Sequence, residues 1–180
     1  TENGIKAISE RNFEVIQMDY LAKKPALTNQ EAEKFGGILE LIASEKNYQL
    51  YEKLDLAGKA KFLVQYWKRK DPDPTSAENE YLNSILERFR YANEKFSWGK
   101  RDGWKTDRGR ILIKYGMPSD IQNHNFVSGS FPYAIWEYQG DRNYIYVFGD
   151  LRGDGRYTLL HSNREGEIYN PNWKEELDRM

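Results

Sequence analysis

The chain has 180 residues, of which 39% are hydrophobic, 31% charged and 14% aromatic. This length suits one domain, or one domain with a substantial appendage, and the aromatic rings can hold a core together because each buried ring removes ~150–250 Å² from water. The formal net charge is −1, from 27 basic and 28 acidic residues, which disfavours general nucleic-acid binding. The absence of cysteine excludes disulfides, zinc–thiolate sites and thiol catalysis.

The start of the chain carries little structural signal. No apolar run approaches the ~20 residues that span a bilayer, the first residue is Thr1, and no signal peptide is present. We expect either that a leader was removed or that the chain belongs to a longer protein. Residues 1–27 are predicted to be a linker or the remnant of a preceding domain.

Residues 28–97 predict four helices. Thr28-Asn29-Gln30-Glu31 fits a capping box, and apolar residues then recur at helical spacing. A short helix around residues 48–54 and a longer one over residues 56–70 follow, and Asp71-Pro72-Asp73-Pro74 ends the longer one because proline lacks the N–H donor. Thr75-Ser76-Ala77-Glu78 fits a second capping box and predicts the start of the longest helix.

Residues 98–162 predict a short helix and a small sheet. Asp107 is a suitable N-cap for a helix that ends before Gly116. Residues 123–132 are predicted to form a polar loop, and three strands are predicted at residues 133–138, 143–148 and 157–161, separated by glycine-containing turns. The fold class is therefore α+β: four helices packed with a short helix and a three-stranded antiparallel meander. Residues 163–180 are predicted to be a tail, with a short helix from Asn172.

Motifs that would support catalysis are missing from the sequence. It contains neither a Gly-x-Ser-x-Gly turn nor a phosphate-binding glycine loop, and His124 and His161 do not have metal-ligand spacing. Residues 150–155 resemble a calcium loop, but Arg152 stands where an oxygen ligand belongs, so a tight turn is favoured. We assign no catalytic residue, no cofactor and no metal ligand.

Six basic residues gather between positions 100 and 114. Arg108 and Arg110 lie near a predicted helix start, where backbone N–H groups favour anions, so an anionic ligand can be expected there. The alternative, which we favour, is that these arginines pair internally with Asp107 or with the acidic residues of segment 71–80.

The predicted sheet offers a second candidate site. Alternation places aromatic side chains on one face and aliphatic side chains on the other. Helices can cover only one face, so the remaining apolar face is expected to meet a partner, unless the tail or the N-terminal segment covers it. The candidate interaction surface consists of Trp136, Tyr138, Tyr144, Tyr146 and Phe148.

One motif resembles a known family. Gly103-Trp104-Lys105-Thr106-Asp107-Arg108-Gly109-Arg110 is similar to the signature of the GWxTD domain family of bacterial proteins, and segments 62–75, 115–118 and 135–138 extend the likeness over about residues 50–162. We therefore predict a GWxTD-like domain over residues 28–162, with a helical part at 28–97 and the short helix and sheet at 98–162. The resemblance implies a bacterial protein, typically from Bacteroidetes and their relatives and usually exported to the periplasm or outer membrane. It implies no catalytic residues.

These observations support three interpretations. The first is a non-enzymatic interaction module of the cell envelope, which contacts a protein partner or a neighbouring domain of a longer chain. The second is a binder or processor of glycans such as peptidoglycan, because aromatic platforms suit sugar rings. The third is structural: Trp104 is buried between the long helix and the sheet, Asp107 caps the short helix and accepts from an arginine, and the motif acts as a packing latch.

Overall fold

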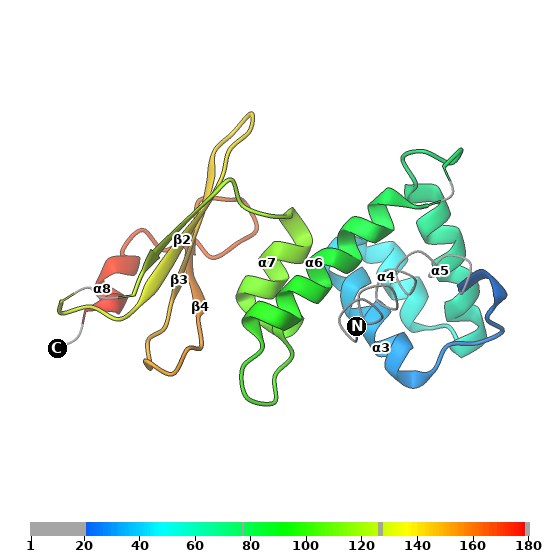
Figure 1. Ribbon diagram of the computed structural model, residues 1–180, viewed down its shortest axis with the longest axis horizontal. Helices are drawn as coiled ribbons and strands as arrows, with labels where there is room; N and C mark the ends of the chain where they lie inside the picture. The colour runs from blue at the N-terminus through cyan, green and yellow to red at the C-terminus, as the bar shows by residue number, and fades with distance from the viewer. Residues whose placement is uncertain (1–20, 77, 126–127, 179–180) are drawn as a thin grey trace, which may run out of the picture. The chain divides into compact units, whose positions relative to one another are not determined.

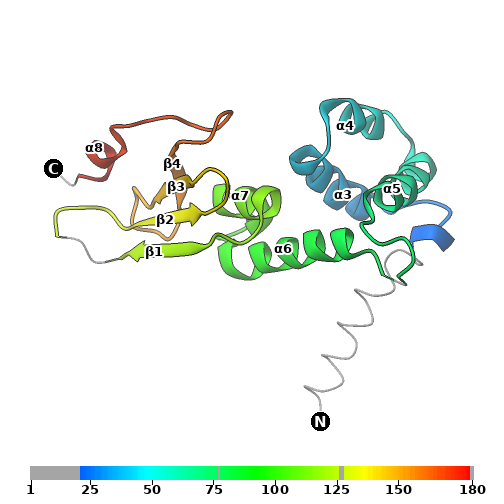
Figure 2. The ribbon, with the colours of Figure 1, turned by 90° about the horizontal axis from the view of Figure 1, so that it is seen from above.

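The computed structural model describes residues 21–76, 78–125 and 128–178. The fold is α+β, as predicted, and the chain divides into two compact units, Thr1–Glu87 and Arg88–Met180. Figures 1 and 2 show the elements of each unit. No helix of the described part combines the length and the apolar character that crossing a membrane requires. Of the predicted linker, residues 1–27, the first 20 residues lie outside the described part of the chain.

The first unit contains α3 (Asn29–Ile42), α4 (Glu45–Glu52), α5 (Leu56–Lys70) and the beginning of α6 (Glu80–Phe96), so the four predicted helices are confirmed. The capping box at the start of α3 is also confirmed, because Thr28 Oγ1 accepts from the Glu31 N–H and the Glu31 carboxylate accepts from the Thr28 N–H at 2.7 Å. The core of this unit consists of side chains at most 4% exposed: Phe35, Ile38, Leu39, Tyr51, Leu63, Tyr66, Trp67, Leu82 and Ile85.

The start of α6 differs from the prediction. Asn79 caps this helix, since its Oδ1 accepts from the Leu82 N–H at 2.8 Å and its Nδ2 donates to the Trp67 carbonyl at 2.8 Å. Thr75, the predicted cap, instead donates its N–H and hydroxyl to Asp73 Oδ1 at 3.0 and 2.6 Å. The predicted second capping box is therefore wrong, because the Asp-Pro segment forms a local turn that uses the threonine before the helix begins.

The second unit holds the C-terminal part of α6, the short 3-10 helix η1 (Gly103–Lys105), α7 (Asp107–Tyr115), a sheet and α8 (Trp173–Leu177). In the described residues the sheet has four antiparallel strands in the order β1 (Asp120–His124), β2 (Tyr133–Tyr138), β3 (Tyr144–Gly149) and β4 (Thr158–Ser162). The predicted sheet lacked β1. This edge strand is mostly exposed and polar, so its sequence has no apolar alternation, and it forms by pairing with β2.

The face of the sheet expected to meet a partner is the face that packs inward. Trp136, Tyr146 and Phe148 are 3%, 0% and 0% exposed. The ring of Phe96 lies 5.6 Å from that of Trp136, and the ring of Tyr115 lies 5.6 Å from that of Tyr146. These three residues therefore belong to the core and not to an interaction surface, because the end of α6 and α7 cover the aromatic face.

Asn79→Ala is expected to lower the free energy of unfolding by about 2 kcal/mol, because it removes a helix cap and leaves the buried Trp67 carbonyl without this donor. Urea denaturation of the wild type and of Asn79→Ala measures this loss of stability. Thr75→Ala is the matched control and is expected to change stability by less than about 0.5 kcal/mol. A larger loss for Thr75→Ala than for Asn79→Ala would show that the helix is capped at Thr75 after all.

Candidate functional site: the pocket at the Gly-Trp-x-Thr-Asp motif

Two glycines allow three backbone segments to touch. A Cβ atom on Gly103 would lie 1.8 Å from the carbonyl oxygen of Ala92 in α6, and a Cβ on Gly109 would lie 1.9 Å from the carbonyl oxygen of Gly103. Real Cβ atoms do not approach backbone this closely, so only glycine fits at either position. The end of α6, η1 and the first turn of α7 are therefore stacked directly on one another.

The remaining residues of the motif fix this stack to its neighbours. The Trp104 N–H donates to Asn93 Oδ1 at 3.1 Å, and the half-buried Trp104 ring stacks on Phe89 with ring centroids 5.6 Å apart. Thr106 caps α7, since its Oγ1 accepts from the Gly109 N–H at 3.1 Å and donates to the Gly103 carbonyl at 2.6 Å.

Asp107 connects α7 to the sheet. Its Oδ2 accepts from the Leu159 N–H of β4 at 2.8 Å. The predicted N-cap role of Asp107 is wrong by one residue, because Thr106 occupies the cap and leaves the carboxylate free to reach the strand. Asp107 accepts from a backbone N–H, and no ion pair between it and an arginine is found among the described residues.

Arg110 pairs with a residue that the sequence did not single out. Its two terminal nitrogens donate to the Glu167 carboxylate at 3.0 and 2.8 Å, and Lys114 and the Tyr115 hydroxyl donate to the same carboxylate at 3.3 and 2.9 Å. The Glu167 side chain is only 3% exposed. Burial alone would raise the pKa of Glu167, but the hydrogen bonds and charge of Arg110, with Tyr115 and Lys114, lower it below its usual value. The prediction of internal pairing holds for Arg110, but the partner is neither Asp107 nor segment 71–80.

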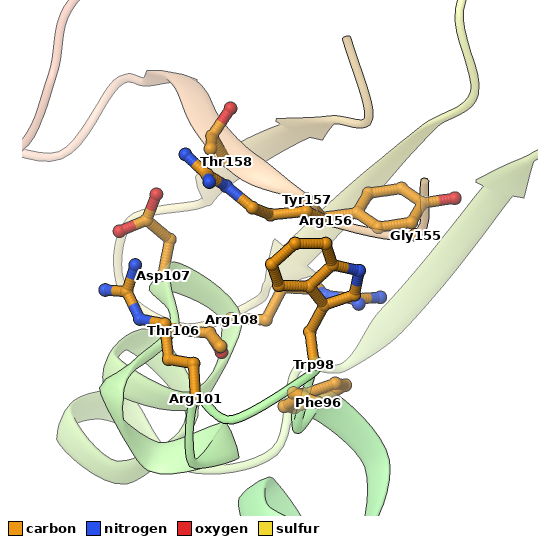
Figure 3. A pocket seen from close by; sticks show the side chains of 10 residues that line it. All are labelled: Phe96, Trp98, Arg101, Thr106, Asp107, Arg108, Gly155, Arg156, Tyr157 and Thr158. Carbon is orange, nitrogen blue, oxygen red and sulfur yellow. The ribbon is translucent and has the colours of Figure 1, made fainter. Parts of the chain in front are cut away.

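Arg108 has a different environment. Its guanidinium carbon lies 4.7 Å from the ring centroid of Phe96 and 4.1 Å from that of Tyr157, so the guanidinium is placed between two aromatic rings. Figure 3 shows the side chain extending between them. Burial lowers the pKa of Arg108, while Tyr157 and Asp150 act in the opposite direction. No hydrogen-bond acceptor for this guanidinium is found in the described part of the chain.

A pocket of about 70 Å³ opens beside Arg108. Trp98 stands at its rim, 38% exposed, with its Nε1 donating to the Asp154 carbonyl at 2.8 Å. Figure 3 shows the guanidiniums of Arg101 and Arg156 extending to the side of Asp107, away from that of Arg108. The lining residues are Phe96, Trp98, Arg101, Thr106, Asp107, Arg108, Gly155, Arg156, Tyr157 and Thr158.

A family model described as the GWxTD domain matches residues 9–179, nearly the whole chain. The chain belongs to the GWxTD domain family. No curated protein and no solved structure matches it. The match is longer than the likeness over residues 50–162 that the motifs indicate. The pocket lined by Thr106, Asp107 and Arg108 is therefore formed in part by the motif that gives the family its name, and we call it the GWxTD pocket.

A second hollow lies at the turn between β2 and β3. Its volume is about 460 Å³, and it is lined by residues 138–142, Tyr144 and Arg164. The Arg164 guanidinium lies 3.9 Å from the ring centroid of Tyr115 and 4.4 Å from that of Tyr144. Tyr138 donates to the Gly116 carbonyl at 2.9 Å, and burial raises its pKa. Of the five aromatic residues proposed as a surface, Tyr138 and Tyr144 thus line an open hollow, which we call the turn hollow.

Other candidate groups are engaged within the fold. The Asp150 carboxylate accepts from the backbone N–H groups of Asp154 and Gly155 at 3.2 and 2.8 Å. These hydrogen bonds stabilise a turn, which is the interpretation favoured for residues 150–155. His161 Nδ1 accepts from the Asn170 N–H at 3.1 Å, and burial lowers the His161 pKa. His124 stacks on Tyr133. Among the described residues, no three His, Asp or Glu side chains are placed to hold a metal ion.

Gly103→Ala is expected to lower the free energy of unfolding by about 3 kcal/mol or more, because the new methyl group would meet a backbone carbonyl that cannot move aside easily. Thermal and urea melts measure this loss. Gly140→Ala is the control: its Cβ would meet nothing closer than the Arg142 carbonyl at 3.9 Å, so a change within about 1 kcal/mol is expected. Equal tolerance of both substitutions would contradict the close backbone contact.

Glu167→Gln is expected to cost about 2 kcal/mol at pH 7, because it removes the charge of a buried carboxylate from its partly buried ion pair with Arg110. The lowered folded-state pKa means that the ionised carboxylate stabilises the protein above its unfolded pKa of about 4.3 and that this stabilisation is lost as the pH falls through the folded pKa. The stability difference between the wild type and the variant should therefore shrink below about pH 4.

Urea melts between pH 3 and pH 7 test the Glu167 prediction. Glu165→Gln, the same chemical change on the exposed part of the same loop, is the control and should shift stability by less than about 0.5 kcal/mol at pH 7. A difference between the wild type and Glu167→Gln that stays constant across this pH range would exclude a role for the charge.

Proposed function

We propose that this GWxTD domain is a non-enzymatic interaction module of the bacterial cell envelope, which binds an acidic segment of a protein partner in the turn hollow. The observation that carries the proposal is the composition of this hollow. It places Tyr138 and Tyr144 beside Arg142 and Arg164 in an open volume of about 460 Å³. Tyrosine and arginine are enriched among the residues that dominate binding energy at protein interfaces.

The arrangement of the side chains supports an acidic partner. Arg142 and Arg164 bring two positive charges to the hollow, against one negative charge from Asp141. Arg164 is held between the rings of Tyr115 and Tyr144, so less side-chain freedom is lost when it pairs with a carboxylate. A partner segment that combines carboxylates with an apolar residue would meet both the guanidiniums and the half-buried tyrosines.

The proposed location rests on the family alone. The GWxTD signature resembles that of bacterial proteins that are usually exported, which supports an envelope setting for the partner. The absence of a recognised catalytic motif in the sequence supports a binding role. Half-buried tyrosine rings that line an open hollow also suit sugar rings, so glycan binding is the alternative that the experiment has to separate from protein binding.

Site-specific photocrosslinking in bacteria that express the chain tests the proposal. A benzophenone amino acid replaces Tyr144 in one variant and Tyr169 in the control, a tyrosine that is 73% exposed and does not line the turn hollow. We expect the Tyr144 variant, and not the Tyr169 variant, to crosslink one envelope protein through an acidic segment mapped by mass spectrometry. Adding Arg142→Glu should reduce the crosslink about tenfold, because it reverses a charge that faces the partner.

Two outcomes would overturn the proposal. Identical crosslinks from Tyr144 and Tyr169 would show that the turn hollow has no specific partner. Crosslinks from Tyr144 to cell-wall glycan, without a protein, would establish the glycan alternative instead.

A further inference from the structure

We propose that the GWxTD pocket is an oxyanion site, in which the edge of the Arg108 guanidinium binds a phosphate or carboxylate group of a ligand. This site is separate from the turn hollow and does not depend on the function proposed for it.

Stacking leaves Arg108 only one way to bind. The ring centroids of Phe96 and Tyr157 lie 4.7 and 4.1 Å from its guanidinium carbon, and Figure 3 shows the side chain between the two rings. The N–H donors of a guanidinium lie in its plane, so rings on both sides leave the edge available. An edge of parallel N–H groups fits the two oxygens of a carboxylate or phosphate. The rings also fix the orientation of the plane before a ligand arrives.

The comparison with Arg110 shows what Arg108 lacks. Both arginines lie in the first turns of α7, and Arg110 has a bidentate carboxylate partner in Glu167. Arg108 has no such partner among the described residues, although burial removes part of its hydration. A partly buried charge without a hydrogen-bonded partner is costly. The oxygens of a bound oxyanion would accept hydrogen bonds from Arg108, as the Glu167 carboxylate accepts them from Arg110.

The pocket beside Arg108 has the size and charge for one anionic group. Its volume is about 70 Å³, and its lining carries three guanidiniums against one carboxylate, that of Asp107. The guanidiniums of Arg101 and Arg156 lie on the Asp107 side, and Arg101 donates to the Lys105 carbonyl, so Arg108 is the group whose edge is offered to the ligand. Asp107 opposes an anion, but its Oδ2 accepts from the Leu159 N–H. The Asp150 carboxylate, which also acts on Arg108, accepts from two N–H groups of its own turn. These hydrogen bonds hold both carboxylates in place without neutralising them, and the three guanidinium charges still exceed the two carboxylate charges.

Trp98 indicates what the anionic group is attached to. This residue is 38% exposed and lines the pocket, and the hydrogen bond from its Nε1 to the Asp154 carbonyl holds its ring in place. An exposed ring next to a guanidinium edge suits a ligand that joins an oxyanion to a flat or apolar group. A phosphate monoester and a carboxylate-bearing ring share this chemistry, and their relative affinities assign the source.

Titration of the isotope-labelled chain, followed by nuclear magnetic resonance, tests the oxyanion site. The probes are phenyl phosphate, benzoate and inorganic phosphate at constant ionic strength, with sodium chloride as the reference. We expect a saturable shift of the Trp98 Nε1–H and Arg108 Nε–H signals with at least one of the oxyanions. Tighter binding of phenyl phosphate would assign a phosphate ligand, and tighter binding of benzoate a carboxylate ligand.

Arg108→Gln is expected to weaken this binding about tenfold or more, because it removes the charge-assisted bidentate bonds. Arg152→Gln is the matched control, since Arg152 is exposed in the β3–β4 turn, does not line the pocket and undergoes the same change of charge. It should leave affinity within about twofold. If Arg108→Gln does not fold, Arg156→Gln, on the pocket wall, provides a second test with an expected loss of about threefold.

The proposal would be overturned by the absence of a saturable shift with every probe. Equal affinity in the wild type and the folded Arg108→Gln variant would overturn it as well. If Arg108→Gln does not fold, unchanged affinity in Arg156→Gln has the same meaning.

Discussion

The second unit depends on a contact between backbones that no side chain mediates. Gly103 lies directly against the carbonyl of Ala92, and Gly109 lies directly against the carbonyl of Gly103. Because these contacts leave no room for a Cβ, they determine where α7 begins after the end of α6. The position of α7 in turn decides which rings can cover the aromatic face of the sheet, as Tyr115 does over Tyr146. The arrangement of this unit thus follows from two positions where only glycine fits.

The polar residues of the motif each reach a different part of the same unit. Thr106 closes the first turn of α7, Asp107 accepts from β4, and Arg110 binds Glu167 in the segment after β4. These bonds explain the threonine, the aspartate and the second arginine by packing and hydrogen bonding alone. Arg108 is the exception, since aromatic stacking accounts for its position, but its N–H donors have no acceptor among the residues that the structure describes.

The two hollows have different chemistry, which separates the functions proposed for them. The turn hollow is wide and open and combines tyrosines with arginines, as protein interfaces do. The GWxTD pocket is small, carries net positive charge and contains an oriented guanidinium, which suits a single anionic group. The turn hollow lies at the β2–β3 turn and the GWxTD pocket at the β3–β4 turn, so the two proposed sites lie at opposite ends of β3.

The sequence by itself determined the elements that depend on local patterns. The capping box at Thr28, the helical spacing of residues 28–97 and the alternation of β2 and β3 predict these elements because neighbouring residues carry the signal. Only the tertiary structure decided the rest. β1 is polar and owes its conformation to β2; the covered face of the sheet depends on where α7 is placed; and Glu167 lies 57 residues from Arg110. The candidate site combines residues from the end of α6, the motif and the β3–β4 turn, which local patterns cannot bring together because no short-range interaction joins them.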